Sequence, residues 1–156
     1  GEQQNGLRSG TLPVPLCVGM GAAAQFINEE QFEKNRVWLR SRRDRFVEKL
    51  MKLPWDIVLN GPVGQSRHPG NANMLFRGFS AQDILSKLQP HLAASTGSAC
   101  TSGIHEPSHV LKAIGLTGDE AEASVRFSLG LDTSENDVDN AITLISDVLN
   151  SVGIAH

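Results

Sequence analysis

Hydrophobic residues recur at helical spacing over the first third of the chain. From about residue 15 to residue 53 the pattern predicts helix, with a bend or break near Asn28. In the second half of this segment one apolar stripe is formed by Leu39, Phe46, Leu50 and Leu53. Pro54 ends the helix, because proline cannot continue one.

Short apolar or alternating runs in the rest of the chain predict strands. They are residues 56–59, 73–76, 92–95 and 124–128. The glycines and prolines between residues 60 and 71 predict a loop.

Three further helices are predicted from their caps and apolar faces. Ser80 and Ser134 each stand three residues before an aspartate, which is a variant of the capping box. Pro107 suits the first turn of a helix that runs to Ile114, with Gly115 following its end. The apolar face of the last helix consists of Val138, Ile142, Ile145, Leu149 and Val152. Helices and short strands thus alternate, which predicts a two-layer α/β or α+β domain with a short-stranded sheet packed by helices.

Composition and charge narrow the class of protein. The 156 residues are 40% hydrophobic and 20% charged, as in a folded globular domain, and the net charge of -3 argues against direct nucleic-acid binding. We find no apolar run of about 20 residues and no secretory signal, so we expect a cytoplasmic protein without a membrane partner. Because the chain starts with Gly1 instead of Met, we expect a piece of a longer protein.

Basic residues concentrate in one segment. They are Lys34, Arg36, Arg40, Arg42, Arg43, Arg45, Lys49 and Lys52. The main interpretation is a solvated helix face, and the alternative is a docking patch for an acidic partner.

The two cysteines have different surroundings. Cys17 follows Leu16 and precedes Val18, which predicts a small buried hydrophobe. Cys100 lies within Ser95–Gly103, among small and hydroxylated residues, where a reactive thiol and an ordinary turn are both possible. A free thiol has a pKa of about 8.5, so a nucleophilic role needs nearby charge or a catalytic partner.

Two other motifs suggest chemistry. His105–His109 matches the H-E-x-x-H zinc signature, which needs both histidines on one continuous helix. Pro107 would interrupt such a helix, so we interpret the match as chance and expect no metal site. Arg126 alternates with apolar neighbours on a predicted strand. It is either a surface charge or a guanidinium that binds a carboxylate.

Several segments together resemble the C-terminal part of a cysteine desulfurase of the NifS/IscS type, in the aminotransferase class V group. They are GLRSGTLPVPLCVGMGAA, NANMLF, STGSACTSG, EPSHVLKAIGL and SVRFSLG, and they follow one another in the family's order. The resemblance implies a fold-type I, pyridoxal-phosphate-dependent homodimer. Residues 1–20 would end its large, cofactor-binding domain, and residues 21–156 would form its small domain, with the cysteine loop at 95–106.

The resemblance also implies roles for three residues. Cys100 matches the nucleophile that takes sulfur from L-cysteine as a persulfide, leaves L-alanine and passes the sulfur to an acceptor or scaffold protein. Arg126 matches the arginine that holds the substrate carboxylate. Thr11 matches the residue that reaches the cofactor phosphate of the neighbouring subunit. The acceptor pathway stays open among iron-sulfur cluster assembly, tRNA thiolation and DNA phosphorothioation.

The chain also departs from the family. The family's cofactor lysine, and the histidine and aspartate beside the cofactor ring, belong to the large domain upstream of this sequence. We therefore expect that this chain alone neither holds pyridoxal phosphate covalently nor turns over cysteine. The family's glycine-rich run before Thr11 is also altered, to Gly1-Glu-Gln-Gln-Asn-Gly6. Two alternatives are a pyridoxal-phosphate-free persulfide carrier or interaction module, and a structural remnant without sulfur chemistry.

Overall fold

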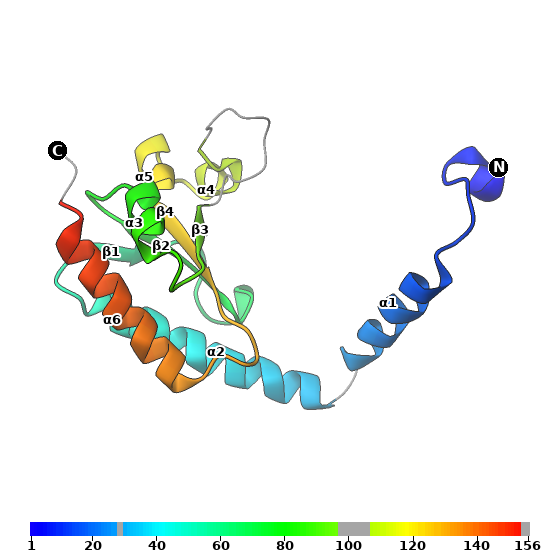
Figure 1. The fold of residues 1–156 in the computed structure, drawn as a ribbon, viewed down its shortest axis with the longest axis horizontal. Coiled ribbons are helices and arrows are strands. Elements are labelled where there is room, and N and C mark those ends of the chain that lie inside the picture. The colour runs from blue at the N-terminus through cyan, green and yellow to red at the C-terminus, as the bar shows by residue number, and fades with distance from the viewer. Residues whose placement is uncertain (28–29, 97–106, 154–156) are drawn as a thin grey trace. The chain divides into compact units, whose positions relative to one another are not determined.

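The computed structural model describes residues 1–27, 30–96 and 107–153 (Figure 1). These residues belong to two compact units, Gly1–Arg36 and Val37–His156. The predicted break near Asn28 and the thiol of Cys100 lie outside the described residues. The predicted domain boundary after residue 20 stays a prediction.

The first unit consists of a 3-10 turn (η1, Gln3–Gly6), the helix α1 (Val14–Phe26) and the start of α2 (Glu30–Met51). Pro15 lies in the first turn of α1, where its missing N–H costs no hydrogen bond. No side chain of α1 is buried. The prediction that Cys17 is a buried hydrophobe is therefore wrong for this structure: Cys17 is exposed, because nothing in its unit packs over this helix.

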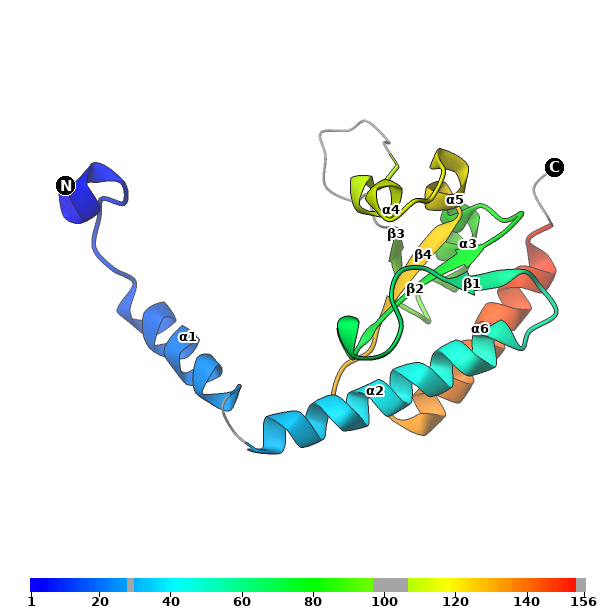
Figure 2. The same ribbon diagram turned by 180° about the vertical axis from the view of Figure 1, so that it is seen from behind.

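The second unit contains a four-stranded antiparallel sheet in the order β1-β2-β4-β3 (Figures 1 and 2). Its strands are β1 (Ile57–Leu59), β2 (Asn71–Phe76), β3 (Ser95–Thr96) and β4 (Ser124–Ser128). Every pair of neighbouring strands is antiparallel, so the fold is α+β, which decides between the two predicted classes.

The helices of this unit are the later part of α2, α3 (Ala81–Leu88), α4 (His109–Ala113), α5 (Gly118–Glu122) and α6 (Glu135–Ser151). In both ribbon views α2 and α6 run side by side along the sheet, and α4 and α5 lie together away from them (Figures 1 and 2). Among the described residues, no helix has the length and apolar character needed to cross a membrane.

One face of the sheet forms the hydrophobic core with α2, α3 and α6. The most buried side chains of this core are Leu50, Met74, Phe76, Ile84, Val125 and Ile145. In β2 and β4 the inward residues alternate with residues on the other face, as the period of a strand requires, and these are polar except for the buried Leu75. The polar face therefore stays available for chemistry.

The predicted caps on α3 and α6 are confirmed. The Ser80 and Ser134 hydroxyls accept hydrogen bonds from the backbone N–H groups of Asp83 and Asp137, and Asp137 completes the capping box. The strand predicted at 92–95 is wrong in position, since β3 is Ser95–Thr96 and the preceding Leu92 packs partly against the core.

The helix predicted to start at Pro107 begins later. The Ser108 hydroxyl caps it by accepting from Leu111 N at 3.4 Å, so the first helical residue is His109. The short helix α5, which the sequence did not predict, is held by a capping box between Thr117 and Glu120.

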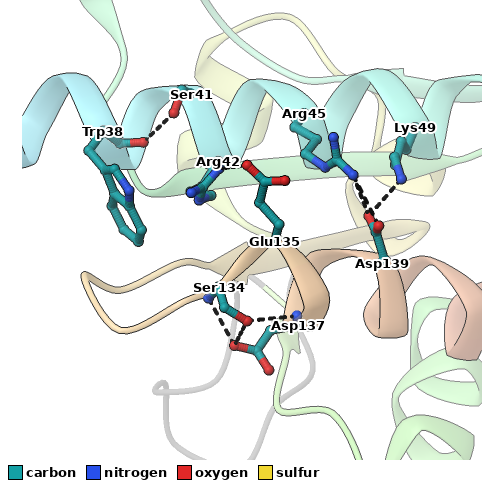
Figure 3. A network of polar contacts seen from close by, with 9 residues as sticks. All are labelled: Trp38, Ser41, Arg42, Arg45, Lys49, Ser134, Glu135, Asp137 and Asp139. Atoms are coloured by element: carbon teal, nitrogen blue, oxygen red, sulfur yellow. Dashed lines mark hydrogen bonds and ion pairs between the residues drawn. The ribbon is translucent and has the colours of Figure 1, made fainter.

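Ion pairs join α2 to α6 (Figure 3). Asp139 accepts from Lys49 Nζ at 2.6 Å and from Arg45 Nη2 at 3.0 Å, and Arg42 bonds Glu135. Arg42 also lies over the Trp38 ring, 4.8 Å from its centroid. Three of the eight basic residues, Arg42, Arg45 and Lys49, thus pair with α6. Lys34 and Lys52 are 63% and 70% exposed, as on the predicted solvated face.

Candidate functional site

Four polar residues form a row across the polar face of the sheet. Asn73 of β2 is the cross-strand partner of Arg126 on β4, and Arg126 is also the partner of Ser95 on β3. On the other side, Asn60 N donates to Asn73 O at 2.9 Å and continues the pairing beyond β1. Directly opposed residues of antiparallel strands share a face. The row is therefore Asn60, Asn73, Arg126 and Ser95, and we call it the polar row.

Hydrogen bonds fix one end of the polar row. Asn60, only 6% exposed, donates from Nδ2 to Asn73 Oδ1 at 2.7 Å and to Ser124 Oγ at 2.9 Å. Ser124 is fully buried, and its hydroxyl donates to Glu120 O at 2.7 Å. Since that hydroxyl proton is already used, Ser124 can only accept from Asn60. The orientation of the Asn60 amide is thereby set.

A second arginine, Arg67, supports the wall beside the polar row. Its Nε donates to Pro62 O at 2.8 Å, its Nη1 donates to Asn71 Oδ1 at 3.0 Å, and its Nη2 bonds Asn60 O. Burial, and after it the charge of Arg43, lowers the pKa of the Arg67 guanidinium. Among the described residues no carboxylate pairs with Arg67, so its role is to hold the loop between β1 and β2 in place.

Three members of the polar row, Asn60, Asn73 and Arg126, line a pocket of about 360 Å³. The loop between β1 and β2 supplies one wall, with Arg67 and His68, and α4 supplies apolar side chains, among them Leu111 and Ile114. Within the described residues Arg126 has no acidic partner, and it is exposed at this pocket. A guanidinium with amide side chains beside it is a suitable site for a carboxylate.

Of the three residues with predicted roles, the structure describes Arg126 and Thr11, which belong to different units. Arg126 lies in the pocket of the second unit. Thr11 is exposed in the segment before α1, in the first unit. Cys100 follows Ser95, the last member of the polar row, by five positions in sequence.

The described residues do not form a site that could hold pyridoxal phosphate covalently. The lysines are Lys34, Lys49, Lys52, Lys87 and Lys112. Four of them lie on α2, α3 and α4, Lys52 directly follows α2, and none lines the pocket that contains Arg126. The pocket thus fits a carboxylate but lacks the amine that the cofactor needs.

The H-E-x-x-H segment falls partly outside the described residues, which include only Pro107 to His109 of it. His109 is the first residue of α4, after the Ser108 cap. In the described parts of the chain, no three side chains of His, Cys, Asp or Glu gather as metal ligands would.

A family model for the class-V aminotransferases matches residues 1–141. The chain belongs to the aminotransferase class-V family. It is 40% identical over 152 residues to a protein named cysteine desulfurase IscS from Rickettsia typhi (strain ATCC VR-144 / Wilmington), and 38% identical to the protein of that name from Rickettsia prowazekii (strain Madrid E). In both comparisons the alignment covers 97% of this chain and 36% of the relative, so this member of the class-V family spans little more than a third of their length.

Solved structures of NifS-like proteins share the fold of this class-V family member. The NifS-like protein from Rickettsia africae ESF-5 superposes with a TM-score of 0.79 at 24% identity, over 96% of this chain and 38% of the other. DndA from Streptomyces lividans superposes with a TM-score of 0.56 at 36% identity, over 82% of this chain and 35% of the other. The predicted α+β fold and family are confirmed.

The residues that line the pocket with Arg126 in this class-V chain are not evident from the sequence. The pattern predicts Asn73 only as part of a strand, and Asn60 and Arg67 only as parts of a loop. One signal was present: Asn71 and Asn73 alternate with the apolar Ala72 and Met74, which indicates a strand with one polar face.

Proposed function

We propose that this chain is the C-terminal part of a cysteine desulfurase, in which Arg126 binds the carboxylate of L-cysteine and Cys100 accepts its sulfur. In the net reaction, sulfur passes from L-cysteine to the Cys100 thiolate, which becomes a persulfide, and L-alanine is left. The observation that carries this proposal is the position of Arg126, which is exposed at a pocket with Asn60 and Asn73 and is paired across the sheet with Ser95, from which the chain leads to Cys100.

The chemistry of the pocket favours an amino-acid carboxylate. A guanidinium binds a carboxylate through two parallel N–H···O bonds, which fix the orientation of the substrate as well as its position. Arg126 projects from β4, which pairs with a strand on each side, so the sheet fixes the backbone from which the guanidinium extends.

The proposal also includes a cofactor, a second subunit and a sulfur acceptor, none of which is part of the pocket that contains Arg126. The cofactor, pyridoxal 5′-phosphate, would be held by the rest of a longer protein, with Thr11 at the phosphate of the second subunit in a homodimer. An acceptor or scaffold protein, such as one for iron-sulfur cluster assembly, would take the persulfide sulfur. A reduced thiol persists in the cytoplasm, which is the location we propose.

The test uses the full-length protein that carries this chain, loaded with its cofactor and supplied with L-cysteine. We expect stoichiometric formation of L-alanine, and a mass increase of one sulfur atom on the peptide that contains Cys100. Cys100→Ala should abolish both, and Arg126→Gln should raise KM for L-cysteine. Arg77→Gln is the matched control, because Arg77 lies beyond the end of β2 and pairs with Asp56 and Glu120.

Two outcomes would overturn the proposal. One is undiminished alanine release from Cys100→Ala, which would mean that the sulfur is taken by another group. The other is a persulfide on Cys100 without any alanine, formed only from an added sulfur donor. That result would favour the cofactor-free carrier.

A further inference from the structure

We infer that Asn73 is a further substrate-binding residue. Its side-chain N–H donates a hydrogen bond to the carboxylate that Arg126 binds. This inference rests on the proposed function of Arg126. The inference is based on the orientation of the Asn73 side-chain amide, which is set by its hydrogen bond from Asn60.

The orientation follows from a chain of hydrogen bonds. The Ser124 hydroxyl gives its proton to Glu120 O, so it accepts from Asn60 Nδ2, and the same Asn60 nitrogen donates to Asn73 Oδ1. The oxygen of the Asn73 amide therefore faces Asn60. Since an amide carries its oxygen and its nitrogen on opposite sides, the NH₂ group of Asn73 faces the other way.

The neighbour on that other side is Arg126. The sheet order places β2 between β1 and β4, and Asn73 is directly opposite Arg126 in the β2–β4 pairing. Both side chains line the same pocket. Among the described residues no acceptor takes the N–H groups of Asn73, so they are available to a ligand between the two side chains.

Two kinds of donor then converge on one anion. The guanidinium supplies charge and the amide supplies a neutral N–H at a fixed angle, which is the combination that binds a carboxylate with a defined orientation. Asn60 and Ser124 act only through Asn73. Their buried bonds keep the amide from flipping, which would place its oxygen against the carboxylate.

The binding test uses this chain, isotope-labelled, and records the side-chain signals of Asn73 and Arg126 by NMR during titration with L-alanine. We expect both signals to shift with L-alanine and neither to shift with L-alaninamide, which lacks the carboxylate. A shift of the Arg126 Nε–H signal without one of the Asn73 amide would overturn this inference and leave the proposed function standing. No shift of either signal would also overturn it, because the chain would then present no preformed carboxylate site.

The kinetic test uses the full-length, cofactor-loaded protein. Asn73→Asp keeps an oxygen that can accept from Asn60, replaces the donor by an acceptor, and adds a negative charge beside Arg126. We expect KM for L-cysteine to rise about tenfold to a hundredfold, the range for losing a hydrogen bond to a charged group, with a smaller change in kcat. Asn71→Asp, which adds the same charge to the same pocket, is the matched control and should raise KM less than Asn73→Asp.

The variants separate this inference from the proposed function. If Arg126→Gln raises KM and Asn73→Asp does not, Asn73 has no part in binding and the inference is wrong. If Arg126→Gln itself leaves KM unchanged, the carboxylate site fails as a whole. Ser124→Ala should raise KM less than Asn73→Asp, because the amide keeps its bond to Asn60.

Discussion

Lys49 Nζ of α2 lies 2.6 Å from Asp139 Oδ1 of α6, two residues 90 positions apart in the chain. Arg45 binds the same carboxylate through both oxygens, at 3.2 and 3.0 Å (Figure 3). One aspartate thus connects two cations of α2 to α6, and these two helices pack with α3 on the core face of the sheet.

Replacing this aspartate should loosen the contact between the helices. We expect Asp139→Asn to lower the midpoint of thermal unfolding modestly, since the pairs are partly exposed and exposed ion pairs contribute little. Asp147→Asn, on an exposed position of the same helix, is the matched control. Differential scanning calorimetry at low salt measures both, and equal midpoints would show that the Asp139 pairs do not stabilise the fold.

Stability should decrease in acid. The pKa of Asp139 is lowered by the hydrogen bond from Lys49 and then by that from Arg45; the pKa of Asp137 is lowered by bonds from Ser134. A carboxyl whose pKa is lower in the folded protein stabilises it above the unfolded pKa, and this contribution is lost as the pH falls through the folded value. The free energy of unfolding in urea should therefore be constant near neutral pH and fall below about pH 4. In Asp139→Asn the fall should be smaller.

The buried guanidinium of Arg67 should be important for the loop that lines the pocket. Arg67→Met leaves the carbonyl oxygens of Pro62 and Asn60 and the amide oxygen of Asn71 without their donor. An unsatisfied buried acceptor costs roughly 1–3 kcal/mol, so we expect a loss of about that size in the free energy of unfolding. Arg77→Met, at a half-exposed site, should cost less than about 1 kcal/mol. Equal losses for the two variants would contradict the role given to Arg67.

Gly70 should be required where the loop enters β2. A Cβ at this position would lie 2.3 Å from Leu129 O, and Leu129 N donates to Gly70 O at 2.8 Å. Gly70→Ala therefore has to push β2 and the end of β4 apart, which we expect to cost about 1–3 kcal/mol, as other overpacked sites do. Gly118→Ala, where a Cβ meets no atom, should be neutral or slightly stabilising. Urea unfolding of the two variants provides the comparison.

Much of the local structure was predictable. The strands at 56–59, 73–76 and 124–128 and the capped helices after Ser80 and Ser134 lie where the pattern predicts them. The wrong predictions concern element ends whose position depends on tertiary or side-chain contacts. Residues 92–94 resemble a strand in composition, but the chain pairs with β4 only from Ser95 on. In the same way Ser108, and not Pro107, sets the start of α4, since its hydroxyl reaches Leu111 N.

The helix caps and the strand that carries Arg126 were predictable because caps and strand alternation depend on residues only two to four positions apart, and the motifs along the chain indicated the family. That Asn60, Asn73, Arg126 and Ser95 form one row became evident only from the folded chain. These residues come from four separate segments, and the register between antiparallel strands is set by long-range pairing and by the burial of the opposite face.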